Sequence, residues 1–497
     1  HVVTLPQALR ESEKHYLTVS YGKVFHQGED DPLAWAPQAE FADHHTCRGV
    51  RRRPTTPPGS LGDPCPGQRP MRWNYHVYHL PGLMRGRGGS RFWFERGPEA
   101  NPNGINYTDY VIADQARAGL ERLAAQPRPW YLAVGFVRPH LPFNSPSSFF
   151  DAFSPNAVPP PPRRDPPSNV SALTANAVRG GQGELNAGMW KRPDENDLVK
   201  KYLLGNPLTP MARKASAAYA AAVSFADAQF GRVIDHLETL GRRQTTAIVM
   251  HSDHGWKLGH LGGWGKHSPL TQDTHVPLII SVPGARSGRI DSPVELIDVF
   301  PTILDLAGVA PRRPRALHGR SLCPTIDTRQ ANAVGFAVSQ WPQVLNSHHK
   351  KEITCMGYSL RVANWTLIQW VLTPTRCTRT GVLRCHGPRR DTLGNAAAWK
   401  ELERRFAGVI DPCSGHADLF RTPPDYGVKP WLEPESRNVI DAYPQIAKEL
   451  RELLVLHLLL GGVDLPEAGA PPLSHLDVQA RHLVRGERFV PRWPHAR

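Results

Sequence analysis

Long hydrophobic runs are absent from this 497-residue sequence, whose most apolar stretch is residues 455–460. A membrane-spanning helix needs about 20 apolar residues, so the sequence predicts no membrane span. Signatures of zinc fingers, basic zippers and RNA-binding sheets are also missing, and no two cysteines form a C-x-x-C pair. Structural zinc sites, thioredoxin-like redox chemistry and a nucleic-acid partner are therefore not expected. The length allows one large buried core and a second, smaller one.

Acidic residues are outnumbered, with 45 Asp+Glu against 59 Lys+Arg and a formal net charge of +14. Such a balance favours a polyanionic partner, for example an acidic polysaccharide or a membrane surface. The alternative is an arginine-biased composition whose charges are simply solvated. The 23 histidines would add positive charge in an acidic compartment.

The seven cysteines are an odd number, so at least one is free or paired between chains. Together with three Asn-x-Ser/Thr sequons, at Asn106, Asn169 and Asn364, they favour a secretory route. The sequence begins with His1 and shows no signal peptide, so we expect an incomplete or processed N-terminus.

Helical and strand patterns alternate along the first 345 residues. Strands are expected at residues 17–20, 130–137, 245–250 and 276–282, and helices at residues 108–123, 215–240 and 294–306. The helix at 215–240 has apolar residues at three- and four-residue steps, among them Val223, Val233 and Leu237. Residues 144–212 are rich in Pro, Asn and Gly, and we expect little regular structure there. The alternation predicts a mainly parallel or mixed sheet covered by helices on both faces.

The last third of the sequence has a different pattern. Residues 357–370 alternate as the strands of an antiparallel sheet do, and residues 443–460 are typical of a closing helix. We therefore expect a large α/β domain at residues 1–345, a small α+β domain at 346–460 and a loosely held tail at 461–497.

The most informative motif is Ser-Asp-His-Gly-Trp at residues 252–256, directly after an expected buried strand. The carboxyl end of such a strand is where open α/β sheets place their sites. Asp253 offers hard oxygen ligands that suit Ca²⁺ or Mg²⁺, and the imidazole of His254 can complete the shell. Lys266, ten residues beyond Trp256, can face an anion held by that metal. The motif therefore indicates metal-assisted chemistry on an anionic ester.

Other polar residues also lie at or just after expected strand ends. They are Lys23 with His26, and His140. With Lys266 and the metal pair they form a set suited to cleaving a sulfate or phosphate ester, because lysines hold the oxygens and histidines move protons. Each residue alone has a plainer explanation, since a histidine at a strand end is commonly structural and a lysine is commonly a solvated charge. The ordered set is what indicates a site.

Four motifs in this order resemble those of the type I sulfatases, and most closely the branch that acts on iduronate 2-sulfate. They are Tyr-Gly-Lys-Val-Phe-His at 21–26, Arg-Pro-His-Leu-Pro-Phe at 138–143, Ser-Asp-His-Gly-Trp at 252–256 and Thr-His-Val-Pro-Leu at 274–278. Met-Gly-Tyr-Ser-Leu-Arg at 356–361 also resembles this branch, as do Cys47 and Cys65, whose counterparts there are disulfide-bonded. The resemblance covers about residues 4–370.

The resemblance implies an alkaline-phosphatase-like fold, with a mixed sheet between helices in the large domain and an antiparallel sheet in the small C-terminal one. It implies hydrolysis of 2-O-sulfate on iduronate residues of glycosaminoglycans, through one Ca²⁺ ion and a formylglycine nucleophile. A lysosomal or secreted location follows from the same resemblance.

The resemblance also implies a role for each residue of the set. Asp253 and His254 would supply half of the Ca²⁺ site, and Lys23 and His26 would stand near the formylglycine. His140 and Lys266 would bind the substrate sulfate, with His140 protonating the leaving alcohol. Trp256 would line the sugar pocket, although a buried aromatic residue beside a site more often serves packing.

Two elements of the sulfatase pattern are missing from the sequence. There is no C/S-x-P-x-R motif, which would supply the nucleophile, and no strand ending in paired Asp. We expect both to lie upstream of residue 1, and this chain alone to be inactive. The alternatives are a catalytically dead protein that binds sulfated glycans, and a phosphodiesterase or phosphatase of the same superfamily.

A third departure lies near the Ser-Asp-His-Gly-Trp motif at residues 252–256. His260 and Leu261 stand where sulfatases usually have Glu and His. Because such supporting positions typically affect metal affinity or activity about 10- to 100-fold, altered activity is expected.

Overall fold

The computed structural model describes residues 3–25, 31, 33–36, 102–103, 105, 107–141, 143–161, 164–180, 209–309, 317–328, 335–346, 352–362, 364–372, 376–380, 382–386, 416–421 and 435–459.

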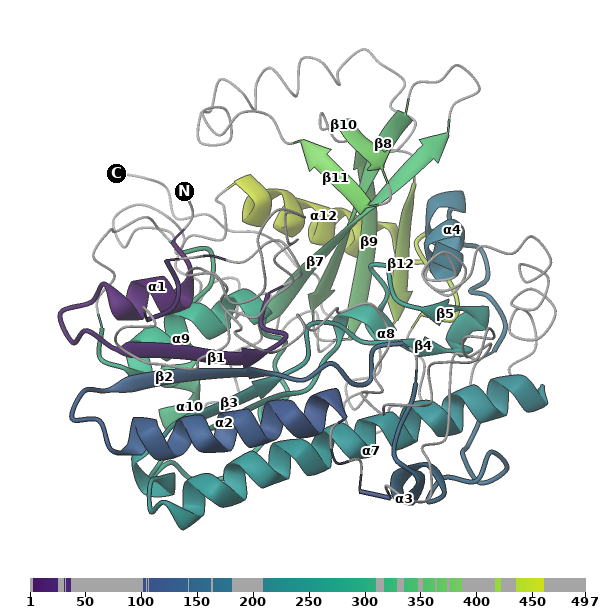
Figure 1. The fold of residues 1–497 in the computed structure, drawn as a ribbon. Helices are drawn as coiled ribbons and strands as arrows, with labels where there is room; N and C mark the ends of the chain where they lie inside the picture. Colours follow the sequence, from purple (N-terminus) through teal and green to yellow (C-terminus); the bar gives the residue numbers. More distant parts are fainter. Residues whose placement is uncertain are drawn as a thin grey trace, which may run out of the picture.

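Two strand pairs run through the larger part of the molecule (Figure 1). β1 (Leu17–Gly22) and β2 (Trp130–Gly135) pair in parallel, whereas β3 (Ile248–His251) and β6 (Leu278–Ser281) pair antiparallel. The strand directions are therefore mixed, as the sequence predicted. β2 and β3 have apolar sequences but stay mostly half-buried, and each pairs along one edge only among the described residues.

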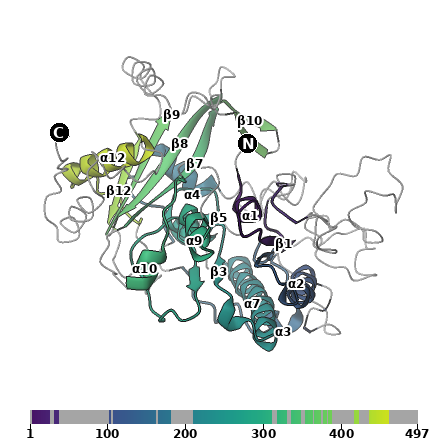
Figure 2. The same cartoon turned by 90° about the vertical axis from the view of Figure 1, so that its left-hand side faces the viewer.

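Helices lie on both sides of β1 and β2. α2 (Thr108–Ala124) packs against both strands and runs alongside α7 (Pro210–Thr239), as Figures 1 and 2 show. α1 (Leu5–Arg10) contacts β1 and α9 (Val299–Leu306) on the other side. The core between these elements is built from apolar residues of β1, α2 and α7.

The long helix α7 has clear signals at both ends. The Thr209 side chain accepts the N–H of Ala212 at 3.1 Å, Pro210 occupies the first turn, and Gly241 follows the helix with a φ of +66°. Val223 is 41% exposed, so its predicted place on the buried stripe is wrong. Alanines form much of the buried face instead, since they allow α2 and α3 to approach closely.

The C-terminal part is a four-stranded antiparallel sheet with one helix packed against it (Figures 1 and 2). The strand order is β12 (Ala417–Arg421), β9 (Trp365–Leu372), β8 (Glu352–Val362), β7 (Phe336–Asn346), and α12 (Pro444–Leu459) covers the sheet. Leucines of α12 pack against β8 and β9 in a separate core cluster. β7 begins at Phe336, ahead of the expected domain boundary at 345, so we propose that the small domain starts before β7.

Short elements connect these parts. They are α3 (Ser147–Phe150), α4 (Ala172–Gly180), η1 (Arg243–Thr245), β4 (Lys257–Leu258), η2 (His260–Gly262), β5 (Trp264–Gly265), α8 (Thr271–Thr274), η3 (Leu296–Asp298), α10 (Cys323–Thr328), β10 (Arg376–Thr380) and β11 (Val382–His386). α3, α4 and the start of α7 fall within residues 144–212, so the expectation of little regular structure there is wrong in part.

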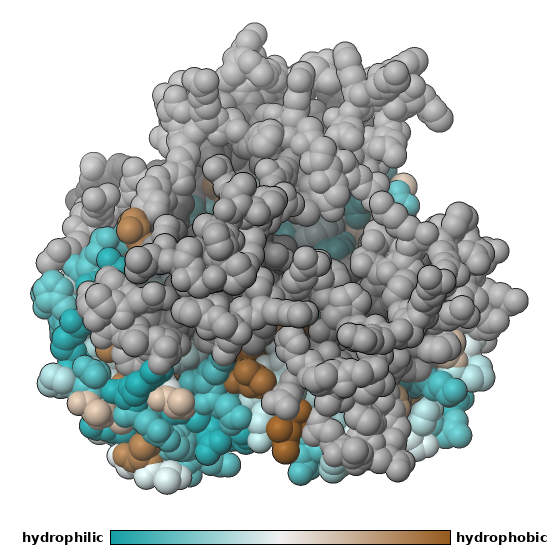
Figure 3. Space-filling view, viewed as in Figure 1, coloured by the Kyte–Doolittle hydropathy of each residue, from teal (hydrophilic) through white to brown (hydrophobic). Residues whose placement is uncertain are grey.

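The described surface shown in Figure 3 is mainly hydrophilic over α2 and α7, with hydrophobic residues in small separate patches. Within the described ranges, no helix combines the length and the apolar character that crossing a membrane requires.

Candidate active site

The Asp253–His254 pair lies directly beyond β3, at its carboxyl end. The next residue, Gly255, is required by close packing. Its N–H donates to the carbonyl oxygen of Asp273 at 2.8 Å, and a Cβ at this position would lie 2.0 Å from the carbonyl oxygen of Gln272. Only glycine fits so close to the backbone of α8. The motif therefore holds the two side chains in a fixed relation to α8.

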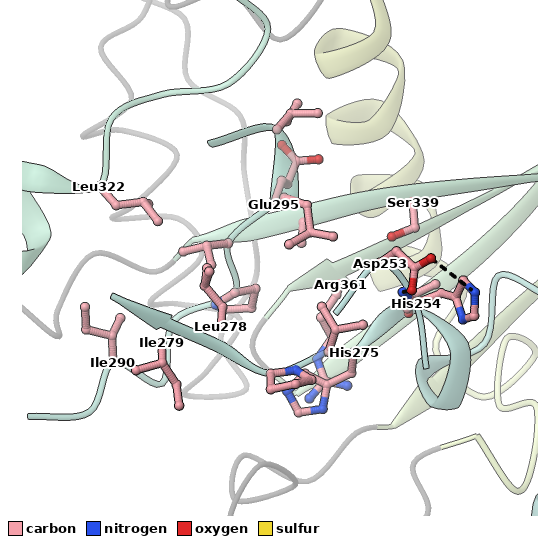
Figure 4. A pocket seen from close by; sticks show the side chains of 18 of the residues that line it. Asp253, His254, His275, Leu278, Ile279, Ile290, Glu295, Leu322, Ser339 and Arg361 are labelled. Carbon is pink, nitrogen blue, oxygen red and sulfur yellow. Dashed lines mark hydrogen bonds and ion pairs between the residues drawn. The ribbon is translucent and has the colours of Figure 1, made fainter. Parts of the chain in front are cut away.

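The imidazole of His254 is held in one tautomer. Its Nδ1 atom lies 2.9 Å from the carbonyl oxygen of Gly255, which can only accept, so Nδ1 carries the proton. The Nε2 atom then has a lone pair, to which Nζ of Lys266 donates at 2.9 Å. The same Nε2 atom lies 3.6 Å from Oδ2 of Asp253, the contact drawn in Figure 4. A lone pair and a carboxylate oxygen thus lie side by side, as two neighbouring metal ligands do.

Positive charges surround Asp253. Nζ of Lys23, one residue beyond β1, lies 3.7 Å from Oδ2 of Asp253. Burial raises the pKa of Asp253, but the electrostatic interactions with His254 and with the charges of Lys23 and Lys266 outweigh it, so this pKa lies below its usual value. The structure therefore brings together Lys23, Asp253, His254 and Lys266 from three separate segments.

His140 lies on the loop that follows β2, and this loop is fixed by buried polar contacts. The Asp109 carboxylate, in the first turn of α2, accepts the N–H groups of Val137 and Arg138 at 2.8 and 2.9 Å. The Arg138 side chain donates to the carbonyl oxygens of His140 and Asn144 at 3.2 and 2.9 Å. The Nδ1 atom of His140 donates to the Leu141 carbonyl oxygen at 2.8 Å. These contacts place the His140 ring at the wall of the cavity described below.

Replacing Asp109 with alanine is expected to lower the free energy of unfolding by about 1–3 kcal/mol. The substitution leaves one buried and one half-buried N–H group without their acceptor. Denaturant unfolding of the variant measures the loss. Asp235→Ala, an exposed position on α7, is the matched control. Equal stability of the two variants would contradict the role given to Asp109.

Five of the expected site residues line one cavity of about 1850 Å³. Lys23, His140, Asp253, His254 and Lys266 are all part of its wall. The cavity extends to β7 and β8 of the C-terminal sheet, so both parts of the molecule contribute to it (Figure 4). Such a volume exceeds the roughly 300–1,000 Å³ of ordinary small-molecule pockets.

Asp253 and His254 alone do not complete a Ca²⁺ site. Ca²⁺ takes six to eight oxygen ligands. Within the part of the chain that the structure describes, no group of three or more His, Cys, Asp or Glu side chains could hold a metal ion. The amino groups of Lys23 and Lys266 lie next to the two donors instead. The metal role of Asp253 and His254 stays a prediction.

Three other predicted residues, His26, Cys47 and Cys65, lie outside the described residues. Trp256 packs against Phe143, with ring centroids 5.8 Å apart, and it is not part of the cavity wall described here. Nζ of Lys266 lies 5.9 Å from the centroid of the Trp256 ring. The substrate-binding role of Trp256 also stays a prediction.

His260 and Leu261 of η2, which depart from the usual sulfatase pattern, are accommodated inside the protein. His260 accepts the N–H of Leu258 at Nδ1, at 3.1 Å, and burial, reinforced by the charge of Lys257, lowers its pKa to about 4. Leu261 is fully buried with a φ of +53°, a left-handed conformation that is strained for leucine. His260 is therefore a neutral structural acceptor in this fold.

Several residues that line the cavity were not predicted as site residues from the sequence. They are His267, His275, Arg289, Ser339, Trp341 and Arg361. His267 stacks on Trp341 at 4.7 Å across the two parts of the molecule, and its φ is +84°. His275 and Arg361 lie inside two of the motifs that resemble those of sulfatases, at residues 274–278 and 356–361. Their positions beside a shared cavity depend on how the C-terminal sheet packs, which no local pattern reveals.

Comparison with known proteins identifies similar chains. The family model described as Sulfatase matches residues 69–309. Iduronate 2-sulfatase of Homo sapiens is 26% identical over 440 residues, which cover 74% of this chain and 70% of that protein. A protein described as a sulfatase from Formosa agariphila is 32% identical over 189 residues, 37% of this chain and 33% of that protein.

A solved structure supports the fold. Phosphonate monoester hydrolase SpPMH from Silicibacter pomeroyi superposes with a TM-score of 0.50 and 22% identity, over 75% of this chain and 65% of that one. The chain thus spans about two thirds of the length of that structure. The expected alkaline-phosphatase-like fold, with its C-terminal antiparallel sheet, is confirmed.

Proposed function

The chain belongs to the sulfatase family, and from this premise we propose that it binds sulfate esters of acidic glycans for hydrolysis, with 2-O-sulfated iduronate as the target. The observation that carries the proposal is the convergence of two lysines, a histidine and the Asp253–His254 pair on one cavity. The excess of basic residues and the similarity to iduronate 2-sulfatase favour a glycosaminoglycan ligand. A lysosomal or secreted setting belongs to the same proposal.

The proposed chemistry divides between cations and a proton donor. Lys266 and Lys23 would hold the negatively charged sulfate oxygens, because ammonium groups there offset the charge that develops as the S–O bond breaks. His140, whose Nδ1 proton is engaged by Leu141, would in its doubly protonated form give the Nε2 proton to the departing sugar oxygen and become neutral. The products of the overall reaction with water are the free alcohol and sulfate.

Sulfatases generally use Ca²⁺ and a formylglycine residue to supply the nucleophile. The 497 residues contain no C/S-x-P-x-R motif, and the described residues do not complete a Ca²⁺ site. We therefore assign to this chain the binding of the sulfate and the protonation of the leaving group. We expect the chain alone to bind the ligand without releasing sulfate.

Replacing Lys266 with alanine is expected to weaken binding of inorganic sulfate and of a 2-O-sulfated iduronate disaccharide about 10- to 100-fold. The lost contact is a charge-assisted hydrogen bond in a partly enclosed site. Isothermal titration calorimetry measures both ligands. Lys214→Ala, an exposed position on α7, controls for the loss of one positive charge. If Lys214→Ala weakened binding as much as Lys266→Ala, the proposed role of Lys266 would be contradicted.

The missing nucleophile motif favours one second candidate, a glycan-binding protein without catalysis. The same titration, followed by ion chromatography of released sulfate, separates the two. Sulfate release from the disaccharide by a form of the protein that carries the motif supports hydrolysis. Binding without release by every form supports the second candidate.

A further inference from the structure

We propose that a second anion-binding subsite lies in the same cavity, formed by His275, Arg289 and Arg361. It would hold an oxyanion, either a carboxylate or a further sulfate ester, on the sugar chain that carries the target sulfate. The inference rests on the proposed function, because it extends the same ligand away from Lys266.

Three separate segments contribute these side chains to the cavity. His275 directly follows α8, Arg289 lies on the segment beyond β6, and Arg361 belongs to β8 in the C-terminal sheet. All three line the cavity that also holds Lys266 and Asp253. Figure 4 shows His275 and Arg361 next to each other, on one side of the Asp253–His254 pair. The cavity therefore carries positive groups at two places.

The local field at this wall is positive. Burial lowers the pKa of His275, and the charges of Arg361 and Arg289 lower it further, so both guanidinium groups act on the imidazole. A planar guanidinium group presents paired N–H donors that match a carboxylate or a sulfate. His275 adds a ring that can accept or donate a hydrogen bond.

Two carboxylates near this wall are held by other groups, although Glu435 also interacts with the charge of Arg361. Glu435 accepts the N–H and hydroxyl of Thr271, at 2.8 and 2.7 Å. Glu295 accepts the N–H of Val338 at 2.9 Å, and burial raises its pKa to about 7, so it carries little charge in mildly acidic solution. Neither carboxylate is placed to neutralise Arg289.

Among the residues that the structure describes, Arg289 pairs with the carboxylate of Asp291, and this exposed ion pair is weak. Its Nε atom lies 2.5 Å from Oδ1 of Asp291, and the two side chains are 51% and 65% exposed. Exposed pairs of this kind contribute only about 0–1 kcal/mol. A ligand oxyanion can therefore replace Asp291 beside Arg289 with only a small loss of free energy.

The neighbouring wall suits a sugar rather than an isolated ion. Ser339 and Ser359 are paired across β7 and β8 and both line the cavity. Hydroxyl groups there can bond to sugar hydroxyls. With about 1850 Å³, the cavity can accept more than one sugar unit.

The test compares two disaccharides with inorganic sulfate, by calorimetry on the intact chain. One disaccharide carries a uronate carboxylate and no sulfate. The other is carboxyl-reduced and carries one sulfate on each sugar. Arg289→Gln is expected to weaken one or both disaccharides about three- to tenfold and to leave inorganic sulfate unchanged. Asp291→Asn, which removes the competing carboxylate, should strengthen the same disaccharide about two- to threefold.

The pattern of losses identifies the oxyanion and separates the two proposals. An effect of Arg289→Gln on the uronate assigns the subsite to a carboxylate, and an effect on the sulfated disaccharide assigns it to a sulfate. If Arg289→Gln matches the exposed control Lys214→Gln for both disaccharides, the subsite is overturned. Failure of the proposed function has another signature, namely inorganic sulfate binding that does not respond to Lys266→Ala.

Discussion

Replacing Lys257 with methionine is expected to lower the free energy of unfolding by about 3–5 kcal/mol, the largest effect among the substitutions considered. The Lys257 side chain is fully buried, and its Nζ atom lies 2.5 Å from Oδ2 of Asp273 and 3.2 Å from Oγ of Ser268. Methionine fills similar space but leaves the Asp273 carboxylate buried without its cation. Removing one partner of a buried ion pair typically has this magnitude.

The double variant Lys257→Met/Asp273→Leu is the matched control. Replacing both charges with apolar groups of similar size is often neutral, so most of the lost stability should return. Urea unfolding of the two single variants and the double variant measures the coupling. A double variant as unstable as Lys257→Met would show that packing, and not the ion pair, accounts for the loss.

The Lys257–Asp273 pair also supports the part of the cavity where Lys266 and His254 lie. It joins β4 to α8, and Ser268, which donates to Oδ2 of Asp273, lies two residues beyond Lys266. The backbone of Asp273 accepts the N–H of Gly255, next to His254. The pair thus holds together the two segments that present Lys266 and His254. Weaker sulfate binding is therefore expected to accompany the loss of stability.

The sequence grouped residues that the structure brings to one cavity, because these residues lie in short motifs at strand ends. Asp253 and His254 follow β3, and His140 follows the strand β2. Each motif carries its own chemical signal, so local reasoning was enough to group them. The same reasoning did not find Arg289, which has no motif of its own.

The errors arise where tertiary packing decides. Val223 fits an apolar stripe by spacing, but alanines form the close contact of α7 and leave Val223 exposed. α3 and α4 form within a Pro-rich stretch that composition alone describes as irregular. Arg361 contributes to the cavity only because the C-terminal sheet packs against the larger part of the molecule. No periodicity in the sequence carries that information.

Replacing Glu435 with glutamine is expected to stabilise the protein relative to wild type by about 2–3 kcal/mol at pH 8, but hardly at all at pH 4.5. Glu435 is fully buried, and burial raises its pKa from 4.5 to about 7, although hydrogen bonds from Thr271 and the charge of Arg361 oppose the shift. Glutamine has the same shape, keeps an oxygen acceptor for Thr271 and cannot ionise.

The sign of this difference follows from proton binding. Between pH 4.5 and 7 the folded state holds a proton on Glu435 that the unfolded state has released, so the contribution of this group to stability falls as pH rises. Glu295, whose burial also raises its pKa to about 7, acts in the same direction. His260 acts in the opposite direction, since its pKa of about 4 makes the fold lose stability as pH falls below 6.5.

Because these groups oppose one another, the wild-type pH profile alone does not report on Glu435, whereas the difference between variant and wild type does. Urea unfolding at pH 4.5, 6 and 8 measures that difference, with Glu238→Gln at an exposed site of α7 as the control. A difference that stays constant with pH would show that Glu435 is ionised equally in the folded and unfolded chain. A difference that grows as pH rises would show that Glu435 is uncharged in the folded protein below pH 7, because burial raises its pKa.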